Sequence, residues 1–71
     1  MSFKDDRNTY LNIAKSTVLT DSEKEEEIAR EFYEREKGYN MKNVSKLASW
    51  IQKETGFDMS AEKLWSIIND L

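Results

Sequence analysis

The sequence predicts a compact all-α four-helix fold, and three observations support this class. Apolar residues recur at helical spacing in four segments, and no segment alternates apolar and polar residues as a strand does. The only two glycines, Gly38 and Gly56, each follow a helical pattern, which is where a left-handed residue closes a helix. Seventy-one residues make one domain at most, so we expect a single helical domain over residues 1–71.

The first helix is expected over about residues 5–16 and the second over about residues 21–37. Thr20 and Glu23 have the spacing of a capping box, in which each side chain satisfies the other residue's backbone N–H, so the second helix should begin there. Gly38 should end it. The residues expected on the apolar sides are Tyr10, Leu11, Ile13 and Ala14 in the first helix, and Ile28, Ala29, Phe32 and Tyr33 in the second.

The third helix is expected over about residues 42–55 and the fourth over about residues 61–70, with a turn at Gly56 between them. Ser60 is the expected N-cap of the fourth helix. Phe57 and Met59 should tuck against the core. The residues expected to face inward are Val44, Leu47, Ala48 and Ile51 in the third helix, and Leu64, Trp65, Ile68 and Leu71 in the fourth.

The residue types argue against catalysis. The chain has no cysteine and no histidine, which excludes disulfides, Cys/His zinc sites, thiol nucleophiles and the commonest general base. The plentiful carboxylates, Glu25, Glu26, Glu27, Glu31 and Glu34, are expected on the solvated side of the second helix. No stretch has the spacing of a calcium loop or of a glycine-rich phosphate loop. We therefore expect a protein that is not an enzyme, with no catalytic residue, no cofactor and no metal site.

The charge of the chain bears on what it can bind, and its hydropathy bears on where in the cell it is expected. The net charge is −3, and the acidity lies in the first half, where residues 1–36 hold six basic and ten acidic residues. No apolar run approaches the roughly 18 residues of a membrane span, and the first residues lack the apolar core of a signal peptide. We expect no membrane partner and a cytoplasmic location.

Association into a homodimer is left open, because small helical domains can complete their cores by pairing.

The leading functional hypothesis is a noncatalytic protein-interaction or regulatory module that docks on a larger host protein; a phage or mobile-element origin fits this class. A protein partner would meet the acidic second helix and neighbouring aromatic side chains, since aromatic residues are enriched where proteins bind one another. The residues expected to bind that partner are Glu27, Glu31, Glu34, Tyr33, Tyr39 and Trp50.

Two alternatives concern nucleic acid. The third and fourth helices could form a helix-turn-helix-like nucleic-acid-binding domain, with Lys42, Lys46, Lys53 and Lys63 on phosphates. This hypothesis is disfavoured because residues 37–71 hold five basic and four acidic residues, a net charge of only +1. The other alternative is an acidic, nucleic-acid-mimicking inhibitor that would use the glutamates between Glu23 and Glu36.

Three short motifs carry a family resemblance. They are Thr9-Tyr10-Leu11, the run from Glu27 to Tyr33 with its Ala-Arg-Glu-Phe-Tyr end, and Leu47-Ala48-Ser49-Trp50-Ile51. In order and spacing the chain resembles the YozE SAM-like family of small cytoplasmic proteins from Gram-positive bacteria. The residues at 38–41, Gly-Tyr-Asn-Met, stand where that family has a Phe-Pro-basic signature. The resemblance implies a SAM-like four-helix domain and no activity, because such domains serve in protein association and in nucleic-acid binding.

Overall fold

Four helices form the regular structure of the part of the chain that the computed structural model describes, residues 7–35 and 40–71. No strand occurs within these ranges, so the all-α class is confirmed. The helices, in chain order, are α1 (Arg7–Ala14), α2 (Asp21–Arg35), α3 (Met41–Thr55) and α4 (Ala61–Asn69).

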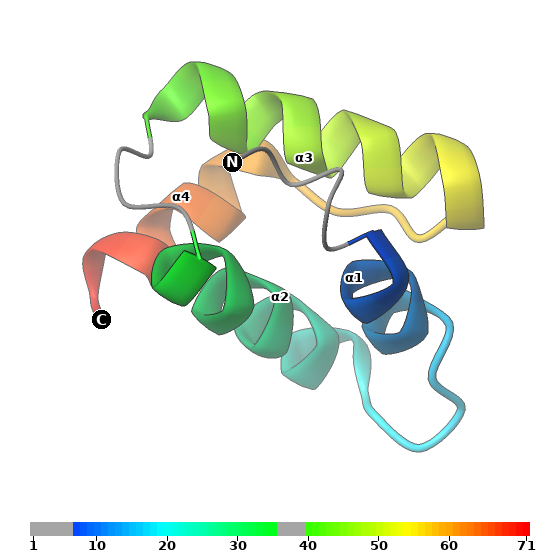
Figure 1. Ribbon diagram of the computed structural model, residues 1–71. Coiled ribbons are helices and arrows are strands. Elements are labelled where there is room, and N and C mark those ends of the chain that lie inside the picture. Colours follow the sequence, from blue (N-terminus) through cyan, green and yellow to red (C-terminus); the bar gives the residue numbers. More distant parts are fainter. Residues whose placement is uncertain (1–6, 36–39) are drawn as a thin grey trace.

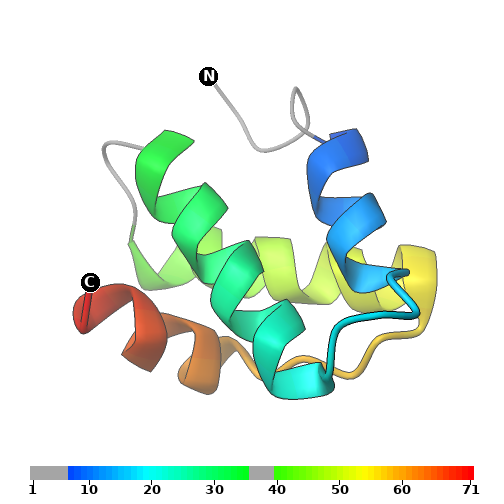
Figure 2. The same cartoon turned by 90° about the horizontal axis from the view of Figure 1, so that it is seen from below.

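The helices form a closed arrangement in which α1 and α4 each pack against both α2 and α3. In Figure 1, α3 lies along the top and α2 along the bottom, with α4 and α1 between them at opposite ends. Figure 2 shows α1 and α2 side by side and antiparallel, with α3 crossing behind them. The outward faces of α2 and α3 therefore lie on opposite sides of the core.

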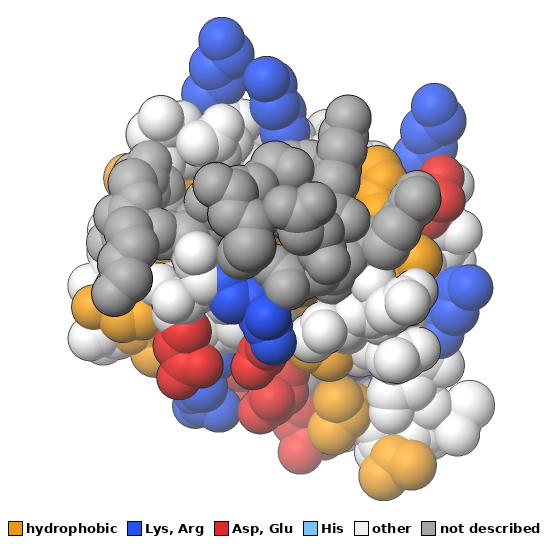
Figure 3. Space-filling view, in the orientation of Figure 1, with side chains coloured by type: hydrophobic (Ala, Val, Ile, Leu, Met, Phe, Trp, Pro, Cys, Tyr) orange, Lys and Arg blue, Asp and Glu red, His pale blue; other side chains and the backbone are white. Residues whose placement is uncertain are grey.

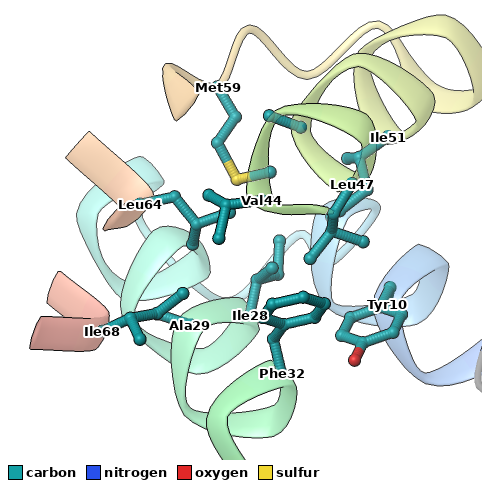
Figure 4. Packing of buried hydrophobic residues seen from close by; sticks show 12 residues of the cluster. Tyr10, Ile28, Ala29, Phe32, Val44, Leu47, Ile51, Met59, Leu64 and Ile68 are labelled. Carbon is teal, nitrogen blue, oxygen red and sulfur yellow. The ribbon is translucent and has the colours of Figure 1, made fainter. Parts of the chain in front are cut away.

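The core is assembled from one apolar stripe of each helix (Figure 4). The rings of Tyr10 from α1 and Phe32 from α2 lie next to each other, with Leu47 of α3 above them. All three are fully buried, and burying one large apolar side chain contributes about 1.5–3 kcal/mol. The buried apolar residues are Tyr10, Ala14, Ile28, Ala29, Phe32, Val44, Leu47, Ala48, Ile51, Met59, Leu64 and Ile68.

The capping box expected at the start of α2 is confirmed. The backbone N–H of Thr20 donates to Glu23 Oε1 at 2.9 Å, and the N–H of Glu23 donates to Thr20 Oγ1 at 3.2 Å. At the start of α3, Asn40 accepts from the N–H of Asn43 at 2.9 Å, a cap that the sequence analysis did not predict. Both helices thus begin where a side chain satisfies a backbone N–H that the helix cannot.

Gly56 ends α3 as expected. Its φ of 78° is left-handed, and its N–H donates to Gln52 O at 2.8 Å. After it, Met59 is buried and Phe57 is half-buried against the core, which confirms that this connection tucks inward. Ser60 then caps α4, accepting from the N–H of Lys63 at 3.4 Å.

Some predicted details were wrong. The first helix ends at Ala14 rather than at Ser16, because the Ser16 hydroxyl accepts from the N–H groups of Val18 and Leu19, at 3.1 and 3.3 Å, in a turn that competes with the helix. Leu71 was expected to face inward, but its exposed fraction is 47%. It follows the end of α4 at Asn69 and so leaves the helical stripe. The predicted end of the second helix, with Gly38, lies outside the described residues.

Candidate protein-binding surface

The outward side of α2 carries a row of carboxylates that we call the acidic face, Glu23, Glu27 and Glu34. Their spacing of four and seven residues keeps them within about 40° of one another on an ideal helix. Buried Ile28 and Phe32 lie on the opposite side of α2. The helix as a whole has seven acidic and three basic residues, a net charge of −4. In Figure 3, Asp and Glu side chains gather along the lower edge, over α2, with cationic side chains among them.

Two ion pairs within α2 moderate this charge. Arg30 Nη1 lies 3.2 Å from Glu27 Oε1, and Arg35 Nη2 lies 2.8 Å from Glu31 Oε1. These pairs span three and four residues on a solvated helix surface, so each contributes about 0.2–0.5 kcal/mol. Such weak pairs can exchange for contacts with a cationic partner at little cost.

The structure separates the aromatic residues predicted to bind a partner. Tyr33 is on α2 and has an exposed fraction of 42%, so its predicted inward position was wrong. It is about 100° around the helix from buried Phe32, at the edge of the buried stripe. Trp50 is on α3, half-buried against the core, on the other side of the molecule from the acidic face. Tyr39 lies outside the described residues.

Glu25 is the clearest correction to the predicted surface. It was expected on the solvated side of α2, but it is buried, with an exposed fraction of 7%. It shares the stripe of Ile28 and Phe32 at spacings of three and seven residues, so the helical pattern could have revealed it. Its Oε2 lies 3.1 Å from Nζ of Lys63 on α4 but makes no hydrogen bond, so the contact is an ion pair without directional geometry.

A second contact between helix surfaces also escaped the sequence analysis. Nζ of Lys24 lies 5.2 Å from the centroid of the Phe57 ring, in cation–π range. It ties the first turns of α2 to the connection between α3 and α4. Together with the Glu25–Lys63 pair, it uses two cations to hold the α4 region against α2. Neither contact follows from sequence spacing, because each joins segments more than 30 residues apart.

The four lysines of the nucleic-acid hypothesis do not form one surface. Lys42, Lys46 and Lys53 are exposed on the outward side of α3, within about 40° of one another, and we call them the lysine stripe. They face away from buried Val44, Leu47, Ala48 and Ile51. Figure 3 shows cationic side chains projecting from the upper surface, over α3. Lys63 instead pairs with Glu25 on the α2 side. The nucleic-acid hypothesis stays a prediction, and three of its four lysines lie on one face.

Within residues 7–35 and 40–71, no group of three or more acidic, histidine or cysteine residues could hold a metal ion. None of the helices described there combines the length and the apolar character that a membrane crossing requires.

Comparisons of the chain with protein-family models, with curated proteins and with solved structures each found no match. The resemblance to the YozE SAM-like family therefore stays a prediction, as does the function that it would imply.

Proposed function

We propose that this protein is a noncatalytic interaction module that docks on a larger protein through the acidic face of α2. The observation that carries the proposal is the row of carboxylates on the outward side of α2, a helix whose 15 residues have a net charge of −4. Its partner would offer a basic surface. Complementary charge speeds encounter and fixes orientation, while the affinity comes from a few well-packed side chains.

Tyr33 is the side chain of α2 best suited to supply that affinity. It is exposed on α2 at the border between the buried stripe and the charged surface. A tyrosine ring adds a large contact area, and its hydroxyl group adds a hydrogen-bonding group that tolerates water. The acidic face would thus orient the partner, and Tyr33 would fill a pocket on it.

Photo-crosslinking in cells that produce the protein tests this proposal. A photoreactive phenylalanine analogue replaces Tyr33, and a control replaces exposed Gln52 on α3, on the other side of the core. We expect one discrete crosslinked partner from position 33 and none of that mass from position 52. Equal crosslinking from both positions would refute the proposed surface.

Charge reversal supplies the matched control. Glu34→Lys alters the acidic face, whereas Glu54→Lys makes the same change in the last turn of α3. Both place a cation near a helix C-terminus, where the helix dipole favours it, so both variants should fold. We expect Glu34→Lys alone to lower the crosslinking yield at position 33. Loss of the crosslink in both variants would mean that overall charge, and not the acidic face, recruits the partner.

A further inference from the structure

The acidic face of α2 and the lysine stripe of α3 share one spacing. The acidic face has carboxylates at 23, 27 and 34, and the lysine stripe has ammonium groups at 42, 46 and 53, so a constant shift of 19 residues converts one set into the other. On ideal helices, both sets step by about 6 Å and then about 10.5 Å along the axis. Two parallel helices carrying these sets would bring all three opposite charges into register.

The same register keeps the one cation of the acidic face away from the heights of the lysines. That cation is Arg30, and the shift of 19 residues places it at the height of Ser49, between Lys46 and Lys53. Like charges facing one another across an interface cost several kcal/mol, so it matters that no lysine of the stripe stands at the height of Arg30.

The two faces cannot meet within one copy of the chain. α2 and α3 lie on opposite sides of the core (Figure 1). Each helix turns its buried stripe toward that core, so the charged sides of both point outward. The lysine stripe of one copy can reach an acidic face only on a second copy. A contact between two different faces is heterologous, and it repeats into a ring or an open chain.

We propose that the lysine stripe of α3 binds the acidic face of α2 on a second copy of this chain, with the two helices parallel. The proposal rests on the acidic face of the proposed function and names a second occupant for it, one that would compete with a larger protein. A polyanion is the less suitable occupant of the lysine stripe, because the rest of the chain is acidic and the net charge is −3.

The parallel register would also bring two aromatic side chains to one flank of the contact. Viewed along the paired axes, Tyr33 of one copy and Trp50 of the other fall on the same side, about 3 Å apart in height. Tyr33 is exposed and Trp50 is half-buried, so both retain surface to bury. The charges would set the register, and the aromatic pair would add apolar contact at its edge.

The experiment uses two full-length variants that each lose one face. Lys46→Glu places a carboxylate within the lysine stripe, and Glu27→Lys places an ammonium group within the acidic face. Both positions are on the solvated side of a helix, and circular dichroism checks that each variant is folded. Concentration-dependent sedimentation at low salt then measures association of the wild type, of each variant and of their equimolar mixture.

We expect the wild type to associate weakly, with an association constant that falls on the order of tenfold in each variant and falls again in high salt. The mixture should recover association to the wild-type level or above. Its wild-type acidic face comes from the Lys46→Glu variant, and its wild-type lysine stripe comes from the Glu27→Lys variant. A self-complementary contact between two identical faces would instead be altered by only one of the two variants, because each variant leaves the other face unchanged.

Lys15→Glu is the matched control, since it makes the same charge change as Lys46→Glu at an exposed position off both faces. It should associate like the wild type. If either variant is unfolded, the pair Lys53→Glu and Glu34→Lys tests the same register at its other end. A wild type that stays monomeric at low salt, or a mixture that stays monomeric, would overturn the inference.

Two further outcomes separate this inference from the alternatives. If a duplex oligonucleotide shifts the α3 amide resonances while the mixture stays monomeric, the lysine stripe binds phosphate and the inference is overturned. Lys46→Glu leaves the acidic face intact and frees it from a second copy, so crosslinking of a larger partner from position 33 should stay the same or rise. If the protein does not self-associate but a larger partner still crosslinks at position 33, this inference alone is overturned. If the protein self-associates but no larger partner crosslinks there, the proposed function alone is overturned.

Discussion

Gly56 ends α3 in a left-handed conformation, and replacing it tests how much that turn depends on glycine. Its φ of 78° and ψ of 1° are left-handed, and its N–H donates to Gln52 O at 2.8 Å. An alanine there keeps the N–H and hence the hydrogen bond. The change therefore isolates the conformational preference of the backbone.

Two opposing backbone effects decide the cost of Gly56→Ala. A Cβ at this position would meet no atom within 4 Å, so no steric clash adds to the cost. Holding an L-residue in the left-handed region costs about 1–2 kcal/mol. Alanine also restricts the unfolded chain, which offsets about 0.4–1 kcal/mol. We therefore expect the free energy of unfolding to fall by about 1 kcal/mol, with a decrease in Tm of about 4–8 °C.

Urea denaturation followed by far-UV circular dichroism measures this loss. Gly56→Asn is the matched variant, and it should lose less than Gly56→Ala because asparagine enters the left-handed region more readily. An alanine variant as stable as the wild type would contradict the left-handed turn. A loss above about 3 kcal/mol would contradict the open space around the Cβ position, because only packing or network effects reach that size.

Four further changes test other parts of the structure by the same denaturation assay. Phe32→Ala should cost about 3–5 kcal/mol and unfold much of the protein in water; a stable, cooperative variant would contradict its full burial. Ser60→Ala removes the cap of α4 and should cost about 1 kcal/mol, whereas no change would argue against the cap. Lys63→Ala leaves the buried Glu25 carboxylate uncompensated, at a cost of about 1 kcal/mol, and a double-mutant cycle with Glu25→Gln should show coupling between the two. Tyr33→Ala should change stability by less than about 0.5 kcal/mol, and a larger loss would mean that Tyr33 belongs to the core.

Local signals predicted the elements well. The capping box at Thr20 and Glu23, the left-handed Gly56 and the cap at Ser60 each involve residues at most four positions apart, so their hydrogen bonds depend on local spacing alone. The buried stripe of α3 followed from helical periodicity for the same reason. The end of the first helix was misjudged because a hydroxyl, at Ser16, competed with the helix for backbone donors.

The candidate site was less accessible to sequence analysis. The glutamates of the acidic face and the exposed lysines of α3 could be identified one by one. Whether they share a surface depends on which helices are neighbours, and periodicity says nothing about that. Trp50 was grouped with the acidic helix for want of this information, although α3 holds it on the other side of the core.

By itself, then, the sequence determined the all-α class, the limits of most helices within the described residues and much of the core, because short-range hydrogen bonding and helical periodicity decide these. The tertiary structure decided the rest. It buried Glu25 against Lys63 of a distant helix and turned the charged sides of α2 and α3 away from each other. Such relations arise when amphipathic helices bury their apolar stripes together, since that packing alone settles where each remaining charge points.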